Sequence, residues 1–432
     1  MWGARPNHEG PKDSSRKSVL ALALVILLLP IAVLNGLLHL DHEPHLCALL
    51  GFAFVLHVLI RPGLREICAD AGAGCLLLLA YSSGYGLPHS DYGPAFTALT
   101  YAGLLGAGSL CVLTVQMRRT TGEERERRGN ALAAGLIAPV GIVLIGYPLQ
   151  ISALMHPRTF DTFLYSFDLS LGWNPSFLLG QAFARFGPLR AVSSFVYDTL
   201  PLVVSFFYAA LKLQKKQFRV NVILLFTGGL LLGSLLYNVC PATGPLYAFG
   251  PAFPMHPPAM GEFVVQPLSV PAAPRNGMPS LHVALALMVF WNAYVWGRKG
   301  RILAGFYLLF TVLATLGTGE HYLIDLVVGV PFAVAMQALF TTDRPLRDPS
   351  RWRPLIVASA ITALWLMVLR SPVILLQPAA FWPWIAIALT LALCWFGKRT
   401  LDSPVIADHE PALAALIPTP PNEGTASISS LS

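Results

Sequence analysis

Residues 302–340 read ILAGFYLLFTVLATLGTGEHYLIDLVVGVPFAVAMQALF and consist of two apolar runs joined by a short polar segment. Each run approaches the ~20 residues that a helix needs to cross a hydrocarbon layer of roughly 30 Å. The second run begins with His321 and also carries Asp325. Ionisable residues are costly inside a membrane, so those that occur in spans are functional candidates. This one stretch therefore indicates both the class of fold and the place of a candidate site.

Similar apolar runs recur along the whole chain of 432 residues. Apolar residues make up 55% of it and Asp, Glu, Lys and Arg only 12%, whereas soluble proteins contain about 25% charged residues. This composition excludes a water-soluble globule and predicts an all-α fold, a polytopic transmembrane helical bundle with about 12 spans. The expected spans are 18–38, 46–60, 70–86, 95–116, 131–154, 192–211, 220–239, 280–297, 302–318, 321–340, 355–370 and 380–397.

The basic residues indicate how the chain is oriented. With the N-terminus in the cytoplasm, the only Lys or Arg residues in outer segments are Arg158, Arg185, Arg190, Arg275 and Arg370, out of 29 in the chain. Positive charge concentrates on the cytoplasmic side of membrane proteins. We therefore expect both termini to be cytoplasmic. We attribute the formal charge of +7 to this topology rather than to nucleic-acid binding.

Two histidines that are far apart in the sequence open two of the expected helices. His282 lies in Pro279-Ser280-Leu281-His282-Val283, and His321 lies in Gly319-Glu320-His321-Tyr322. The orientation given above places both helix starts at the outer face of the membrane. We therefore expect the two imidazoles to meet in one pocket.

Asp325 follows His321 by one helical turn. Residues at i and i+4 share a helical face, so this carboxylate can accept a hydrogen bond from one imidazole nitrogen and leave the other more nucleophilic. Gly329 and Ala333 continue the same face, and small residues such as these let a neighbouring helix pack closely.

The starts of both helices are also expected to bind an anion. Unpaired backbone N–H groups and the positive end of the macrodipole favour a phosphate at a helix N-terminus. Ser280 can add a hydroxyl donor, and Arg275 and Asn276 can contribute from the adjoining loop. A nucleophilic imidazole, an acid for the leaving oxygen and donors to the phosphoryl oxygens are the components of phosphoryl transfer.

At these residues the chain resembles the type 2 phosphatidic acid phosphatase (PAP2) superfamily. The resemblance consists of Pro279-Ser280-Leu281-His282 and His321-x-x-x-Asp325, each of which opens a helix. With the stretch Tyr237-Asn238-Val239-Cys240-Pro241-Ala242-Thr243-Gly244-Pro245 added, the pattern is similar to the inositolphosphotransferase branch, whose eukaryotic members make inositol phosphorylceramide. The resemblance covers roughly residues 131–340 and implies a six-helix catalytic core.

The resemblance implies a role for each catalytic residue. His321 would be the nucleophile that forms a phosphohistidine, Asp325 its orienting carboxylate, and His282 the general acid for the departing alcohol. The resemblance also implies that no metal or other cofactor is needed.

The chain departs from the phosphatase branch of that superfamily at two places. That branch has a Lys and an Arg in a first motif and a Ser-Arg pair shortly before the nucleophile. Here Pro241–Pro245 occupies the first place, and Ala314 and Thr315 occupy the second. A phosphomonoesterase should need those cations for a dianionic phosphate, so the departure favours chemistry on a monoanionic phosphodiester.

Further residues have both a functional and an ordinary interpretation. Tyr237, Asn238, Thr243 and Tyr247 can line a headgroup site, but polar and aromatic residues are common at any membrane interface. The stretch His39–His45 contains residue types that suit zinc. Because Pro44 breaks a helix there, we interpret this stretch as an interfacial loop.

Two outer segments are long, and long ordered loops are often functional. Residues 155–191 and 240–279 are therefore candidates for walls or lids over the site. Asp161 and Asp168 are seven residues apart on an expected amphipathic helix in the first segment, and we interpret them as its solvated face.

These observations divide the chain into four parts. They are N-terminal transmembrane helices of unknown role (1–128), a phosphatase/phosphotransferase-like six-helix core (129–342), two extra C-terminal transmembrane helices (343–400) and a disordered cytoplasmic tail (401–432).

The sequence predicts an integral membrane lipid phosphotransferase that works at the outer face of a bacterial plasma membrane, moving a phosphoinositol-type headgroup to a lipid alcohol. The expected partners are membrane lipids: a lipid phosphate or phosphoglycerolipid donor, and a lipid alcohol or water as acceptor. One alternative is a lipid phosphate phosphatase. Another is a proton-coupled transporter or flippase, in which the buried His and Asp residues would relay protons. The oligomeric state is left open.

Overall fold

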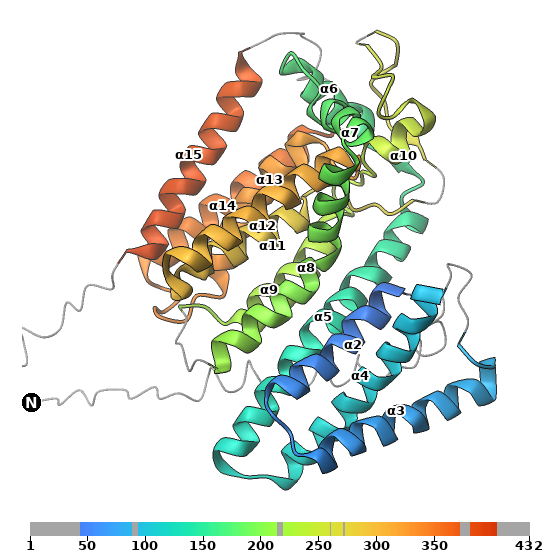
Figure 1. Cartoon of the computed structure of the whole chain (residues 1–432). Helices are drawn as coiled ribbons and strands as arrows, with labels where there is room; N and C mark the ends of the chain where they lie inside the picture. The colour runs from blue at the N-terminus through green and yellow to red at the C-terminus, as the bar shows by residue number, and fades with distance from the viewer. Residues whose placement is uncertain are drawn as a thin grey trace, which may run out of the picture.

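The computed structural model describes residues 44–88, 94–213, 219–259, 261–270, 273–371 and 381–403. These residues form an all-α bundle (Figure 1). Its long helices are α2 (Pro44–Leu59), α3 (Leu64–Tyr85), α4 (Pro94–Arg119), α5 (Gly122–Met155), α8 (Gly187–Leu213), α9 (Val222–Leu236), α11 (Leu281–Asn292), α12 (Gly297–Gly317), α13 (Leu323–Leu339), α14 (Pro349–Val368) and α15 (Trp382–Asp402). Every expected span within the described residues coincides with one of these helices.

The described residues contain six helical segments that are long and apolar enough to cross a membrane, or seven if the bent helix α8 is one span. The helices α2, α9 and α13 are apolar but shorter. The predicted class, a polytopic helical bundle, is confirmed. The number of about 12 spans stays a prediction. The expected span 18–38 and the loop residues 39–43 lie outside the described residues.

The two long segments predicted as walls fold into short elements. They contain β1 (Arg158–Thr159), α6 (Asp161–Ser170), α7 (Pro175–Arg185), α10 (Pro245–Phe249), the 3-10 turn η1 (Gly250–Ala252) and β2 (Leu268–Ser269). Strands β1 and β2 pair antiparallel and so join the two segments to each other. Figure 1 shows α6, α7 and α10 gathered at one end of the long helices.

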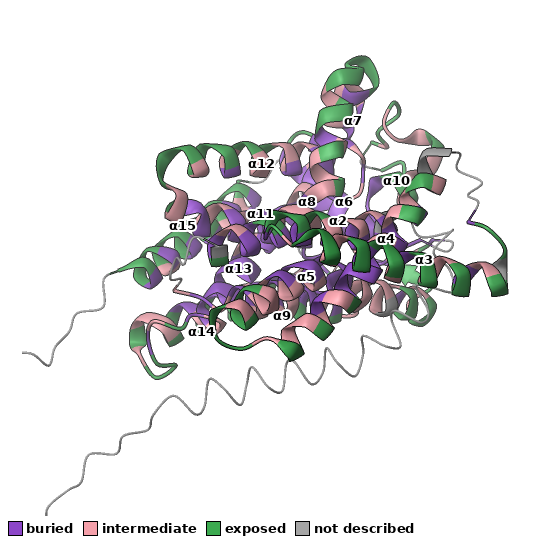
Figure 2. Ribbon diagram, turned by 60° about the horizontal axis from the view of Figure 1, so that its bottom comes forward, coloured by how far each residue is buried: buried purple, intermediate pink, exposed green. Residues whose placement is uncertain are grey.

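Helix α13 is the most enclosed of the long helices. Most of its residues are buried (Figure 2), and it packs against α9, α11, α14 and α15. At Gly329 an added Cβ would lie 2.9 Å from the backbone oxygen of Ser280, so only glycine lets α11 begin this close to α13. The close helix packing predicted from Gly329 is therefore confirmed.

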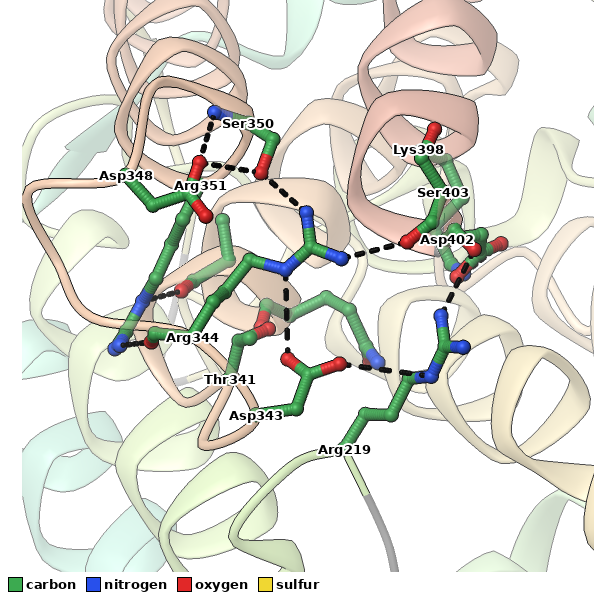
Figure 3. A network of polar contacts seen from close by, with 12 residues as sticks. Arg219, Thr341, Asp343, Arg344, Asp348, Ser350, Arg351, Lys398, Asp402 and Ser403 are labelled. Carbon is green, nitrogen blue, oxygen red and sulfur yellow. Dashed lines mark hydrogen bonds and ion pairs between the residues drawn. The ribbon is translucent and has the colours of Figure 1, made fainter. Parts of the chain in front are cut away.

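A polar network joins the helices at the end of α13 opposite to His321 (Figure 3). The Arg219 guanidinium lies 3.5 Å from the Asp343 carboxylate and donates to the backbone oxygen of Asp402 at 2.8 Å. Arg344 donates to the backbone oxygen of Ser403 at 2.6 Å. These contacts connect the start of α9 and the loop after α13 to the end of α15, so they anchor the C-terminal helix to the core.

Helix α5 connects the N-terminal helices to the rest of the bundle. It packs against α2 and α4 on one side and against α8 and α9 on the other. The boundary predicted between residues 128 and 129 falls inside this continuous helix, which begins at Gly122.

The N-terminal helices contain a buried ionisable pair that the sequence did not reveal. The Nδ1 atom of His57 on α2 lies 2.7 Å from the Asp70 carboxylate on α3, and both side chains are fully buried. The pair joins α2 directly to α3, whereas otherwise each of these helices packs mainly against α4. Because a buried charge is tolerated only with a partner, each residue depends on the other.

We expect Asp70→Ala to destabilise the protein by about 3–5 kcal/mol, because His57 would then be buried without its carboxylate. The measurement is the midpoint of thermal unfolding in detergent micelles. Replacing both residues by leucine should recover most of the loss, since it removes both desolvated groups. An unchanged midpoint for Asp70→Ala would show that the pair does not hold α2 to α3.

Candidate active site

His321 lies in the short loop between α12 and α13, and its side chain is 1% exposed. Its Nδ1 atom lies 2.8 Å from the backbone oxygen of Gly277. A carbonyl oxygen can only accept, so Nδ1 carries the proton and the Nε2 lone pair is left for chemistry. The backbone around His321 is also fixed, because Ser176 on α7 donates to the His321 carbonyl at 2.9 Å.

Asp325 lies beside the imidazole but does not receive its hydrogen bond. The Oδ2 atom of Asp325 is 3.4 Å from His321 Nδ1, within ion-pair range, and it accepts a hydrogen bond from the Tyr322 N–H at 2.8 Å. The hydrogen bond that we expected from His321 to Asp325 goes to Gly277 instead. Asp325 therefore lies against the imidazole and closes the start of α13.

His282 is the second residue of α11, and its ring stacks on Tyr197 of α8 with 3.8 Å between centroids and 19° between planes. One residue before α11, the Ser280 N–H donates to the backbone oxygen of Asp325 at 3.1 Å. This bond joins the residue before α11 to the first turn of α13, so it brings the start of the helix that carries His282 next to the loop that carries His321. Segments about 40 residues apart in the sequence thus meet at one end of the bundle.

The N–H groups at the start of α13 are already occupied. Leu323 and Ile324 donate to the Asp168 carboxylate of α6 at 2.7 Å and 3.2 Å, and Tyr322 donates to Asp325. The phosphate site that we expected at this helix start is therefore filled by carboxylates. At the start of α11 the Ser280 hydroxyl is fully buried and has no hydrogen-bond partner among the described residues. The start of α11 therefore keeps a buried hydroxyl that the described residues do not use.

Asp161 of α6 is a second fully buried carboxylate, and it holds the loop before α10. It accepts hydrogen bonds from the N–H and the hydroxyl of Thr243, from the N–H of Gly244 at 2.8 Å and from the hydroxyl of Tyr322 at 3.1 Å. The interpretation of Asp161 and Asp168 as a solvated face is wrong. The side chain of Thr243, expected to contact a headgroup, is used to build the site instead.

Gly244 lets this loop lie directly against the residue before the nucleophile. Its φ is +88°, and a Cβ there would come within 2.4 Å of the Glu320 backbone oxygen. Both the conformation and the space exclude a larger residue.

Arg275 is buried, and its guanidinium donates to the backbone oxygens of His156, Ala273 and Val270. We had expected it to bind a phosphate, but these bonds assign it to the architecture of the loop. The side chain of its neighbour Asn276 lies close to the Glu320 carboxylate.

The other three expected binding residues are differently placed. The Tyr247 hydroxyl lies 3.5 Å from Glu320 Oε1. Tyr237 is 3% exposed, with its hydroxyl against the backbone of Leu281. The Asn238 amide donates to the Leu235 carbonyl of its own helix at 3.3 Å. Tyr237 and Tyr247 thus lie at the site, while Asn238 caps α9.

Burial shapes the ionisation of the loop around His321. It lowers the pKa of His321 from 6.5 to about 4, against the opposing effects of the Glu320 charge and the Gly277 carbonyl. Burial also raises the pKa of Glu320, although His321, Asn276 and Tyr247 act in the other direction. His321 is therefore neutral, and hence nucleophilic, at neutral pH.

Four residues that contact the site, Asp161, Asp168, Glu320 and Tyr197, were not predicted as site residues from the sequence. Asp161 and Asp168 carried a visible signal, their position in an otherwise apolar segment. Glu320 was part of the quoted motif but had no partner in the sequence. Tyr197 lies within an apolar run, and no pattern marked it.

The comparison with protein families agrees with this geometry. Residues 162–339 match a family described as the PAP2 superfamily. The matched region includes Asp168 and both histidines, and Asp161 precedes it by one residue. This match supports the superfamily that the motifs resemble, and with it a phosphatase/phosphotransferase-type lipid enzyme in a membrane. No curated protein and no solved structure matches the chain.

We expect Asp168→Ala to destabilise the start of α13, because the N–H groups of Leu323 and Ile324 would be buried without an acceptor. Each unsatisfied group costs about 1–3 kcal/mol. Hydrogen exchange at these two amides should become faster while amides in the middle of α13 keep their protection. Equal exchange in wild type and variant would contradict the capping role.

The lowered pKa of His321 also predicts how the reaction rate depends on pH. Because the folded pKa is lowered to about 4, the imidazole stays neutral as pH falls well below 6.5. In a single turnover, protonation of His321 should therefore cause no fall in rate between pH 7 and about pH 5. A loss centred near pH 6.5 would show that the nucleophile is not buried as described.

Proposed function

We propose that this chain is a lipid phosphotransferase that works through a phosphohistidine at His321. The observation that carries the proposal is the hydrogen bond from His321 Nδ1 to the Gly277 carbonyl, which leaves Nε2 unprotonated beside the start of α11. Superfamily membership supports a phosphatase/phosphotransferase-type lipid enzyme. The identity of the nucleophile and of the transferred group goes beyond that support.

In the first step, His321 Nε2 attacks the phosphorus of a lipid phosphodiester in line with the leaving oxygen. An N–P bond forms, the P–O bond to the diacylglycerol breaks, and His282 gives its proton to the departing oxygen. The Ser280 hydroxyl donates to a phosphoryl oxygen. The Gly277 carbonyl and the Asp325 charge stabilise the positive charge that develops on His321.

In the second step, the acceptor alcohol attacks the phosphohistidine. His282, now neutral, takes the proton of the alcohol, a new P–O bond forms and the N–P bond breaks. The chain returns to its initial state with His282 protonated. Water in place of the alcohol would give hydrolysis by the same route.

The lack of cations favours a phosphodiester substrate. In the described part of the chain, no hydrogen bond or ion pair recorded for His282, His321 or Ser280 involves Lys or Arg, and Arg275 is bound to three carbonyls. A monoanionic phosphodiester needs less charge compensation than a dianionic phosphomonoester. This supports the inositolphosphotransferase branch and transfer of a phosphoinositol-type headgroup.

The proposed location follows from the distribution of basic residues. The site lies at the start of α11 and α13, which the positive-inside rule assigns to the outer face, with both termini in the cytoplasm. We propose the bacterial plasma membrane.

The test uses purified protein in detergent with a phosphatidylinositol labelled with ³²P. Wild-type protein should form an acid-labile, base-stable phosphoprotein, and His321→Ala should form none and lose turnover by at least about 10³-fold. Arg185→Ala, an exposed change on α7, is the matched control and should keep activity. Wild-type-like turnover in His321→Ala would remove His321 from the nucleophile role.

The same preparation separates the alternatives. Turnover that depends on an added lipid alcohol indicates transfer, whereas turnover in its absence indicates a phosphatase. A transporter or flippase would cleave nothing in detergent, where no gradient exists.

A further inference from the structure

Glu320 lies directly before the nucleophile, and its side chain is held from two other elements. The Tyr247 hydroxyl of α10 lies 3.5 Å from Oε1, and the Asn276 side chain, from the loop before α11, lies close to the carboxylate. The next residues of the same two segments are bonded, since His321 Nδ1 donates to the Gly277 carbonyl. Two consecutive residues of one loop thus face two consecutive residues of the other, which places Glu320 next to the His321 imidazole.

The surroundings of Glu320 contain hydrogen-bond acceptors and aromatic rings. Tyr197, which stacks on His282, lies near Glu320, Tyr237, Tyr247 and Asp198. The Asn276 Oδ1 atom is buried and has no hydrogen-bond partner among the described residues. This buried amide oxygen near a carboxylate requires a donor that the described residues do not supply.

Neighbouring hydroxyl groups of a polyol are the donors that fit. A carboxylate accepts short, strong hydrogen bonds from hydroxyls, and an adjacent amide oxygen can accept from the next hydroxyl on the ring. A second phosphate charge at the same place would be repelled, because the described residues place no Lys or Arg in contact with Glu320.

We propose that Glu320, together with Asn276, is the specificity-determining residue of the site and binds hydroxyl groups of the polyol headgroup carried on the reacting phosphorus. This inference rests on the proposed function, because the headgroup must stay on the phosphorus through both steps. The same carboxylate disfavours phosphatidic acid, which brings a dianionic phosphate and no hydroxyls.

The experiment compares three donors with purified full-length protein in lipid nanodiscs. They are phosphatidylinositol, phosphatidylcyclohexanol, which lacks the headgroup hydroxyls, and phosphatidic acid. Wild-type protein should prefer phosphatidylinositol to phosphatidylcyclohexanol by at least about tenfold in kcat/KM. The analogue brings no hydroxyls, so the acceptor groups of Glu320 and Asn276 would stay without hydrogen bonds. Glu320→Ala should reduce this ratio to near one, mainly through KM for phosphatidylinositol.

Glu320→Gln separates hydrogen bonding from charge. It keeps an acceptor oxygen and the shape of the side chain but removes the negative charge, so it should retain part of the hydroxyl preference and gain turnover of phosphatidic acid relative to wild type. If Glu320→Ala does not fold, Glu320→Gln alone still tests whether the donor ratios depend on this side chain. Glu262→Gln, an exposed glutamate of the long loop, is the matched control and should leave both ratios unchanged.

The outcomes separate this inference from the function on which it rests. If wild-type protein forms a phosphohistidine and the donor ratios are the same in Glu320→Ala, Glu320→Gln and wild type, the role of Glu320 is overturned while the proposed function stands. A uniform loss across all three donors would likewise overturn it, since that indicates a structural role only. If wild-type protein forms no phosphoenzyme from any donor, both proposals fail.

Discussion

The candidate site depends on the hydrogen bonds that Asp161 and Asp168 of α6 accept. Asp161 and Asp168 are fully buried, and their recorded hydrogen bonds come from backbone N–H groups and from hydroxyls. A buried carboxylate without a cation is stable only when such donors surround it. The donors belong to the loop before α10 and to the start of α13, so the need to satisfy two buried carboxyl groups fixes both segments. His321 is held between them.

This arrangement explains why His321 is held in place although it lies in a loop. His321 lies outside any helix, yet its imidazole is bonded to Gly277 and its carbonyl to Ser176 of α7. Its neighbours Glu320 and Tyr322 are bonded to further elements. The rigidity therefore comes from convergence of short segments at one end of the bundle. The network around Arg219 and Arg344 holds the other end together.

Several features of the site were visible in the sequence, and others were not. Periodicity and hydropathy place the long helices because each apolar run must satisfy its own backbone in a membrane. The pairing of Asp168 with Leu323 joins residues more than 150 positions apart, which no local pattern can indicate. From their residue types, Arg275 and Thr243 were predicted to bind a ligand. In the structure the Arg275 guanidinium donates to backbone carbonyls, and the Thr243 hydroxyl donates to Asp161.

The sequence by itself determined the class of fold, the place of the two histidines at helix starts, and the close packing at Gly329. Each of these depends on local properties: hydropathy, helical spacing and side-chain size. Tertiary structure decided which acceptor takes the His321 proton, which helix start is left for an anion, and which acidic residue faces the reacting group. These contacts depend on which donors and acceptors meet when distant segments pack. Burial raises the free-energy cost of leaving any of these groups unpaired.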